Sequence, residues 1–212
     1  MPDFFLTRRL LLGSTAALFA GMPAIPAAHA EPATIQPIQT LTDGLLQVMK
    51  MGQQTPFDRR FDVLAPIIDR TFDLSLILRN SIGSSWSSLS AEQQGQLLQA
   101  FRRYTIASYV NSFNAFNGQH FVIEPQTQTL DTGDRVVRTK IVPASGEAHQ
   151  LDYVMRDTAD EWRVVDVLAD GTISRVAVQR SDFRRLLARG GAPALLAQLQ
   201  TKTANLSNGE AG

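Results

Sequence analysis

The sequence predicts a single α+β domain in which helices pack on one face of an antiparallel sheet of four to five strands. Apolar residues recur every three or four positions from residue 35 to about residue 117, which is the period of a helix. From Gly118 onward, β-branched residues occur in short runs separated by turn residues. A second helical pattern follows from residue 181. This segregation of helices and strands is typical of an α+β domain.

The first half of the chain is predicted to form helices. Ile35, Ile38, Leu41, Leu45 and Val48 fall on one helical face and predict a helix over residues 35–51. The same spacing recurs over residues 57–72, and the apolar run at 74–78 indicates a further short helix.

A proline interrupts the second of these helical patterns. Pro66 lies inside it and predicts a kink near Ala65, because proline removes a hydrogen bond from the helix interior.

The longest helix is predicted to start after Ser90. Ser90 and Gln93 have the spacing of a capping box, and Asn117-Gly118 is a suitable stop. This helix is unusually rich in aromatic residues, namely Phe101, Tyr104, Tyr109, Phe113 and Phe116. Such a stripe suits either a well-filled core or the wall of a ligand pocket, and periodicity alone favours the core.

The second half is predicted to form an antiparallel meander followed by helices. The expected strands are residues 120–124, 135–142, 150–156, 162–168 and, more weakly, 173–178. Ser181 is expected to cap a short helix that ends at Gly190-Gly191, and Pro193 to open the last helix. Residues 201–212 are expected to be a disordered tail.

The amino terminus resembles an export signal. Arg8 and Arg9 precede an apolar stretch at 10–22, which is followed by the small-residue triplet Ala28-His29-Ala30. We therefore expect residues 1–30 to be a signal peptide, cleaved after Ala30, and the mature protein to be periplasmic. The paired arginines also fit a twin-arginine signal. The apolar run is shorter than the roughly 20 residues that span a bilayer.

Composition excludes several classes of function. The chain has no cysteine, which removes disulfide frameworks, thiolate nucleophiles and cysteine-ligated metal sites. Cleavage of residues 1–30 takes away two arginines and one aspartate, so the mature net charge is about −1, which gives no case for nucleic-acid binding. His120 and His149 lack a second ligand at metal-binding spacing, and we expect neither a metal site nor a cofactor.

One carboxylate is a candidate for acid–base chemistry. Counting by twos along the strand at 162–168 places Asp166 on a mainly apolar face with Trp162, Val164 and Leu168. Asp166 is then either a general base, with Tyr104 as proton donor, or a structural residue satisfied by a partner. The structural role is the more common one.

Residues 35–199 resemble the MlaC-type periplasmic phospholipid-binding family of toluene-tolerance and lipid-asymmetry transport systems, and its hopanoid-associated HpnM branch most of all. The resemblance is carried by Asp69-Arg70-Thr71-Phe72-Asp73, Gly83-Ser84-Ser85-Trp86, Phe101 with Tyr104 and Tyr109, Tyr153-Val154-Met155, Trp162-Arg163-Val164-Val165-Asp166-Val167, Asp170-Gly171-Thr172-Ile173-Ser174 and Arg180-Ser181-Asp182-Phe183. Arg175 and Val176 stand where the family usually has an apolar pair, which argues against a pocket role for Arg175.

The resemblance implies a cystatin/NTF2-like fold with a curved sheet and an apolar cavity between helices and sheet. Such a protein carries phospholipid, or a hopanoid, between an inner-membrane ABC transporter complex and an outer-membrane lipoprotein complex, and is not an enzyme. The expected lipid-binding residues are Phe72, Leu76, Trp86, Phe101, Tyr104, Tyr109, Tyr153, Val165 and Val167. Two alternatives stay open: an NTF2-like enzyme that uses Asp166 on a hydrophobic small molecule, and a non-catalytic adaptor of hopanoid biosynthesis or transport.

Overall fold

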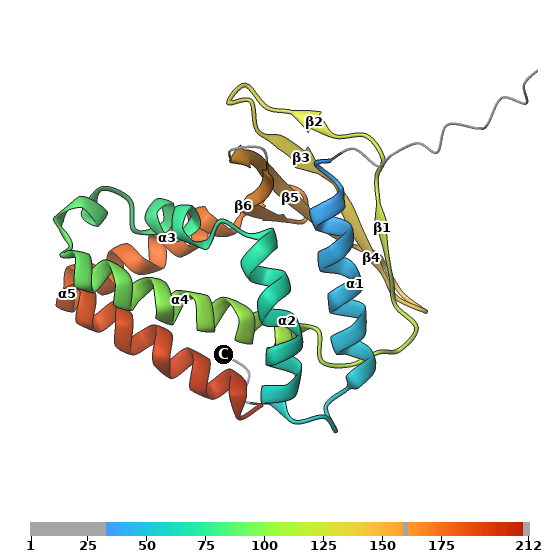
Figure 1. Ribbon diagram of the computed structural model, residues 1–212, viewed down its shortest axis with the longest axis horizontal. Helices are drawn as coiled ribbons and strands as arrows, with labels where there is room; N and C mark the ends of the chain where they lie inside the picture. Colours follow the sequence, from blue (N-terminus) through green and yellow to red (C-terminus); the bar gives the residue numbers. More distant parts are fainter. Residues whose placement is uncertain (1–32, 159–160, 210–212) are drawn as a thin grey trace, which may run out of the picture. The chain divides into compact units, whose positions relative to one another are not determined.

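The computed structural model describes residues 33–158 and 161–209, drawn in colour in Figure 1. These residues belong to one of two units of the chain, Glu31–Gly212. The other unit, Met1–Ala30, is the expected signal peptide, and it lies outside the described residues together with the expected cleavage site. No helix in the described ranges is both long enough and apolar enough to cross a membrane.

Two helices begin the domain, as the spacing of apolar residues predicts. Helix α1 spans Gln36–Met51, and its side chains Ile38, Leu41, Leu45 and Val48 are fully buried. Helix α2 spans Phe57–Thr71 and continues through Pro66, which does not end it. The two helices pack side by side (Figure 1).

The aromatic helix is next, and its start is confirmed. After α3 (Leu74–Ile82) and the short 3-10 helix η1 (Gly83–Ser88), helix α4 spans Ala91–Ser112. The Ser90 hydroxyl accepts a hydrogen bond from the Gln93 backbone N–H at 3.2 Å, and the Gln93 side-chain oxygen accepts one from the Ser90 backbone N–H at 3.0 Å. The expected end at Asn117-Gly118 is wrong, because the helix stops at Ser112 and Phe113 is its C-cap.

The sheet is an open antiparallel meander, also as expected (Figure 1). Within the described ranges it has seven strands: β1 (His120–Ile123), β2 (Gln128–Thr129), β3 (Arg135–Val137), β4 (Thr139–Val142), β5 (His149–Thr158), β6 (Glu161–Ala169) and β7 (Ile173–Ser174). Strands β3 and β4 pair with β5 in a single register on either side of Arg138. They are the predicted strand at 135–142, interrupted where the Asp152 carboxylate accepts a hydrogen bond from the Thr139 backbone N–H at 3.2 Å. The short strand β2 was not expected.

A β-bulge reverses the faces of β6. Val154 pairs with Asp166 but Met155 pairs with Val164, so Val165 is an extra residue without a partner on β5. Val164 and Val167 consequently both face the helices and join the core, whereas Val165 is buried but lies outside that core. Strict alternation through residue 165 is therefore wrong.

The expected strand at 173–178 is confirmed only for Ile173–Ser174, and the expected cap at Ser181 is wrong. Helix α5 begins at Arg175, directly after the two-residue strand β7, and the Ser174 hydroxyl accepts a hydrogen bond from the Ala177 backbone N–H at 3.0 Å. Helix α5 reaches Ser207 and Leu206 is buried, so residues 201–207 are ordered helix rather than a disordered tail. The last residues of that expected tail, 210–212, lie outside the described residues.

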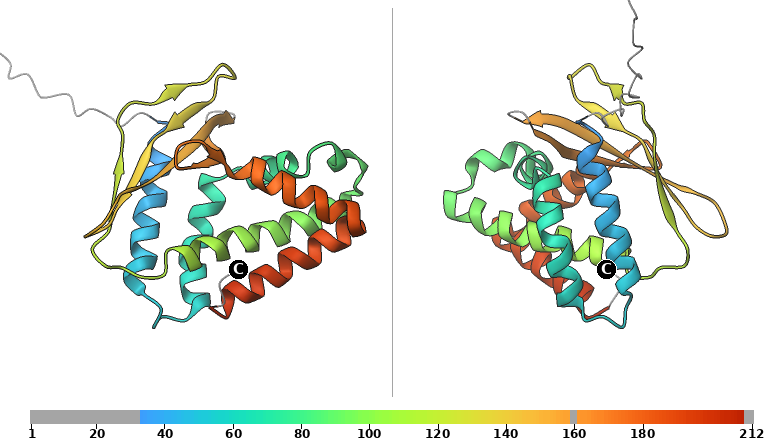
Figure 2. Two further views of the ribbon diagram at one scale, coloured as in Figure 1. Left: turned by 180° about the vertical axis from the view of Figure 1, so that it is seen from behind. Right: turned by 45° about the vertical axis from the view of Figure 1, so that its right-hand side comes forward.

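Two glycines divide α5, as expected. Gly190 and Gly191 have non-helical backbone angles, and the chain folds back at this point. The second half of α5 returns alongside the first, and α4 runs between them (Figure 2). Phe101 of α4 meets Phe183 of α5 edge to face, with ring centroids 6.2 Å apart. The helices therefore form a layer on one face of the sheet.

Candidate functional site: an apolar pocket under helix α4

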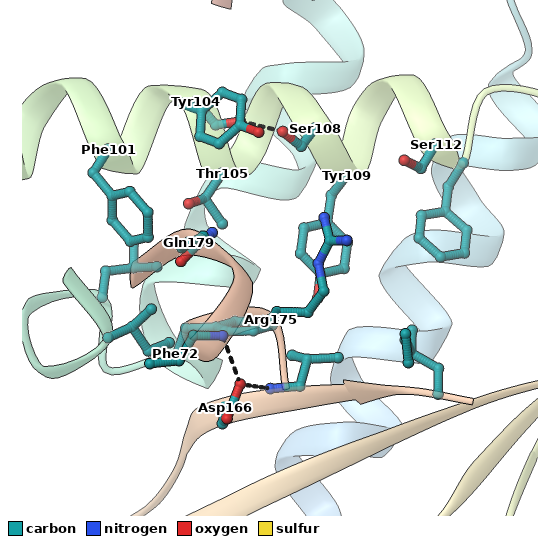
Figure 3. Close-up of a pocket in the computed structure, with 17 residues that line it drawn as sticks. Phe72, Phe101, Tyr104, Thr105, Ser108, Tyr109, Ser112, Asp166, Arg175 and Gln179 are labelled. Atoms are coloured by element: carbon teal, nitrogen blue, oxygen red, sulfur yellow. Dashed lines mark hydrogen bonds between the residues drawn. The ribbon is translucent and has the colours of Figure 1, made fainter. Parts of the chain in front are cut away.

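A cavity of about 350 Å³ lies between α4, α3, the start of α5 and strands β5 and β6 (Figure 3). This volume is at the lower end of the roughly 300–1,000 Å³ typical of small-molecule pockets. Its lining is mainly apolar and aromatic. The residues that line it are Phe72, Leu74, Ile77, Phe101, Tyr104, Thr105, Ser108, Tyr109, Ser112, Phe113, Leu151, Asp166, Val167, Ala169, Arg175, Val176 and Gln179.

Aromatic rings form a continuous wall along one side of the pocket. Tyr109 meets Phe72 edge to face at 5.5 Å and stacks on Phe113 at 5.9 Å, measured between ring centroids. Phe113 in turn lies 6.0 Å from Phe121 of β1. Rings in contact are stiff and bury large areas, so this wall gives the cavity a fixed apolar surface.

A buried pair of tyrosines lies at this wall. Tyr109 lines the pocket, and Tyr153 of β5 is its fully buried neighbour. Burial raises the pKa of both phenols, and the proximity of Tyr109 raises that of Tyr153 further. The Tyr153 hydroxyl has no hydrogen-bond partner of acceptable geometry among the described residues. The Tyr153 hydroxyl is thus an unsatisfied polar group close to a mainly apolar cavity.

Arg175, the first residue of α5, also lines the pocket, contrary to the expectation from the sequence. Its side chain is exposed and extends from α5 toward Tyr109 (Figure 3). The positive charge of Arg175 acts to lower the pKa of Tyr109, against the larger effect of burial. A single cation therefore stands at the solvent-facing edge of the pocket.

The carboxylate of Asp166 is occupied by structural hydrogen bonds. It accepts one from the Val167 backbone N–H at 2.7 Å and one from the Val176 backbone N–H at 3.1 Å (Figure 3). It also accepts a short one from the Ser174 hydroxyl. These contacts tie β6 to the first turn of α5. The arrangement is a helix cap supplied by a neighbouring strand.

The structure brings together five of the nine expected site residues: Phe72, Phe101, Tyr104, Tyr109 and Val167 line the pocket. The remaining four, Leu76, Trp86, Tyr153 and Val165, are not among its lining residues. Trp86 is partly buried against the core and packs beside Arg79, with the guanidinium 5.9 Å from the ring centroid. Their roles in ligand binding stay predictions.

Several lining residues were missed by reasoning from the sequence. Leu74 and Ile77, which are three residues apart on one face of α3, line the cavity in place of Leu76. Thr105, Ser108 and Ser112 add hydroxyl groups on the pocket side of α4. Their spacing of three and four residues was a usable signal, because it continues the helical face of Phe101.

The described part of the chain offers no candidate metal centre. No three His, Asp or Glu side chains within residues 33–158 and 161–209 lie close enough together to hold a metal ion. The chemistry available in the pocket is that of apolar contact, hydroxyl groups, the Gln179 amide, the Asp166 carboxylate and one guanidinium.

Comparison with solved structures supports the fold. The domain is similar to a phospholipid-binding protein from Ralstonia solanacearum, solved in complex with a phospholipid. The TM-score is 0.71 with 23% sequence identity, and the match covers 82% of this chain and 98% of that one. At this level of identity the likeness establishes the shared architecture.

Comparison with sequences gives the family. The chain is 24% identical over 179 residues to the toluene tolerance protein ttg2D of Pseudomonas putida, covering 82% of this chain and 81% of the relative. It is 25% identical over 122 residues to the intermembrane phospholipid transport system binding protein MlaC of Haemophilus influenzae, covering 56% of each chain. The profile of the MlaC protein family matches residues 39–201, which is most of the chain, and the chain therefore belongs to the MlaC family.

Proposed function

We propose that this protein is a periplasmic phospholipid carrier whose cavity shelters the acyl chains of its cargo. The observation that carries the proposal is the aromatic-walled cavity of about 350 Å³ between helices and sheet. Family membership and the phospholipid-binding relatives support the same conclusion.

The energetics suit a lipid tail. Each methylene transferred from water to an apolar site gains roughly 0.8 kcal/mol, so a cavity of this kind needs neither a metal nor a cofactor to bind a tail. Transfer of the tail from the cavity back into water costs the same free energy. Delivery therefore requires an acceptor that takes the tail directly, and a docked membrane complex provides one.

The proposed carrier works in the periplasm and exchanges lipid with two membrane complexes. The amino-terminal pattern of Arg8 and Arg9, an apolar stretch and Ala28-His29-Ala30 supports export to the periplasm. There the protein exchanges lipid with an inner-membrane ABC transporter complex and an outer-membrane lipoprotein complex. Phospholipid is the proposed cargo, and a hopanoid is the alternative that lipid identification distinguishes.

The enzyme alternative finds less support at the site. A general base needs a carboxylate oxygen free to take a proton from a substrate. Both oxygens of Asp166 already accept hydrogen bonds from groups of β6, β7 and α5. The adaptor alternative requires no cavity at all, and the cavity under α4 therefore favours the carrier.

The experiment is to express the full chain with its own signal, purify the exported protein, extract it with organic solvent and identify lipids by mass spectrometry. We expect copurifying phospholipid at a fixed ratio to protein. Thr105→Trp fills the cavity from the middle of α4 and is expected to abolish copurification. Gln99→Trp, at an exposed position on the same helix, is the matched control. A lipid-free wild-type protein, or equal lipid in both variants, would contradict the carrier.

A further inference from the structure

The feature that the carrier role leaves unexplained is a line of polar groups leading into the apolar cavity. It starts at the exposed Arg175 guanidinium, passes to the Tyr109 hydroxyl in the wall, and ends at the buried Tyr153 hydroxyl behind it. Acyl chains alone need none of these groups. Their order, from solvent inward, matches a ligand whose charged and polar parts adjoin its tails.

Arg175 is available to bind an anion. None of the ion pairs within residues 33–158 and 161–209 involves its guanidinium. Asp166 is the one carboxylate among the lining residues, and its oxygens are taken by Ser174, Val167 and Val176. Guanidinium groups bind phosphate with paired, charge-assisted hydrogen bonds, and so Arg175 suits a phosphate better than an uncharged group.

Tyr153 supplies the second, independent observation. Its side chain is fully buried, and its hydroxyl lacks a partner of acceptable geometry in the described part of the chain. An unsatisfied buried hydroxyl costs free energy, which is regained if the group acquires a partner when ligand binds. A phenol hydroxyl both donates and accepts, so Tyr109 can donate to a ligand oxygen while it accepts from Tyr153.

We propose that Arg175 binds the phosphate of the lipid head group at the pocket edge, and that Tyr109, backed by Tyr153, donates a hydrogen bond to an adjacent oxygen of the same head group or its ester linkage. This inference rests on the proposed function, because it places the tails of that lipid in the cavity under α4. It makes Arg175 a specificity-determining residue that distinguishes phosphate-bearing lipids from uncharged ones such as a hopanoid or a diacylglycerol.

The test compares two lipids that differ only in the phosphate. Delipidated protein is titrated with short-chain phosphatidylglycerol, below its micelle concentration, and with diacylglycerol bearing the same chains. Arg175→Gln is expected to weaken phosphatidylglycerol binding about five- to tenfold, the range for a charge-assisted contact at a partly exposed site, and to leave diacylglycerol binding unchanged. Arg175→Lys is expected to keep part of the preference, since it retains the charge but not the paired geometry.

Two controls separate the possible outcomes. Arg184→Gln removes one exposed positive charge from the same helix, away from the pocket lining, and is expected to change neither affinity. Glycerol phosphate tests a head group without tails, and binding as tight as that of phosphatidylglycerol would reveal an anion site independent of lipid and overturn the inference. Equal weakening of both lipids by Arg175→Gln would assign Arg175 to packing and also overturn it. If the wild type binds neither lipid, the carrier function itself fails.

The tyrosines are tested with the same pair of lipids. Tyr109→Phe removes the hydroxyl and keeps the ring contacts with Phe72 and Phe113. It is expected to weaken phosphatidylglycerol binding several-fold. Thr201→Val removes a hydroxyl from an exposed position of α5 outside the pocket lining, and as the control it is expected to have no such effect. Equal loss of affinity in Thr201→Val and Tyr109→Phe would contradict the assignment of Tyr109.

Discussion

The Asp166 carboxylate on β6 accepts a hydrogen bond from the backbone N–H of Val176, in the first turn of α5, at 3.1 Å. The same carboxylate accepts one from the hydroxyl of Ser174, the N-cap of α5. One side chain of the sheet therefore holds the start of the helix that carries Arg175. This position gives the one acidic residue of the pocket lining a structural role.

Replacing Asp166 tests this structural role. Asp166→Asn keeps one acceptor oxygen and puts an amide N–H₂ in place of the other, which leaves either Ser174 or the helix N-terminus without its acceptor. We expect the free energy of unfolding to fall by about 1–2 kcal/mol, measured by urea denaturation. Asp62→Asn, at an exposed position on α2, is expected to change it by less than about 0.5 kcal/mol. Equal stability of the two variants would show that the cap contributes nothing.

Removing the unsatisfied hydroxyl of Tyr153 is expected to stabilise the lipid-free protein. Tyr153→Phe keeps the fully buried ring and deletes a hydroxyl that has no hydrogen-bond partner of acceptable geometry in the described residues. An unsatisfied buried polar group costs about 1–3 kcal/mol, so we expect a gain of about 1 kcal/mol in urea denaturation of delipidated protein. Bound lipid must be absent, because it stabilises the folded state by mass action. A destabilised variant would indicate that the hydroxyl already has a partner in solution.

Much of the fold follows from local patterns. The capping box at Ser90 and Gln93 and the buried face of α1 are local signals, and both are confirmed. The failures lie where long-range structure overrides such signals. Residues 173–178 look like a strand because they are rich in β-branched side chains. However, the Ser174 cap and the Asp166 carboxylate start a helix at Arg175.

The pocket was harder to predict than the fold. The bulge at Val165 shifts the faces of β6 by one residue, and nothing in the local sequence marks it. Strict alternation thus predicted that Val165 and Val167 share one face of the strand, whereas Val167 belongs to the core cluster and Val165 does not. Trp86 was expected in the pocket because it is an apolar residue that matches a family position, yet η1 places it beside Arg79. Arg175 was set aside because it departs from an apolar pattern, although it extends toward the Tyr109 ring.

The buried tyrosines predict a specific response to alkali. The pKa values of Tyr109 and Tyr153 are raised in the folded protein, whereas an unfolded tyrosine ionises near pH 10. Above about pH 10 the unfolded state therefore loses protons that the folded state retains, and stability falls as pH rises. We expect the ultraviolet absorbance of tyrosinate from two of the three tyrosines to appear only on unfolding. Reversible ionisation of all three before unfolding would contradict the burial of this pair.

Two glycine-to-alanine substitutions are expected to act in opposite directions. Gly191 has φ 65° and ψ −158°, a conformation essentially restricted to glycine, at the point where α5 folds back. Gly191→Ala therefore introduces strain of about 1–3 kcal/mol, and the fall in unfolding free energy should appear in urea denaturation. Gly95 lies inside α4, and a Cβ there meets no atom within 4 Å. Gly95→Ala is thus expected to stabilise by about 0.5–1 kcal/mol, since alanine favours the helix and restricts the unfolded chain. Equal stability of Gly191→Ala and Gly95→Ala would contradict this prediction. It would mean that residue 191 adopts a backbone conformation open to any side chain, rather than the one observed where α5 folds back.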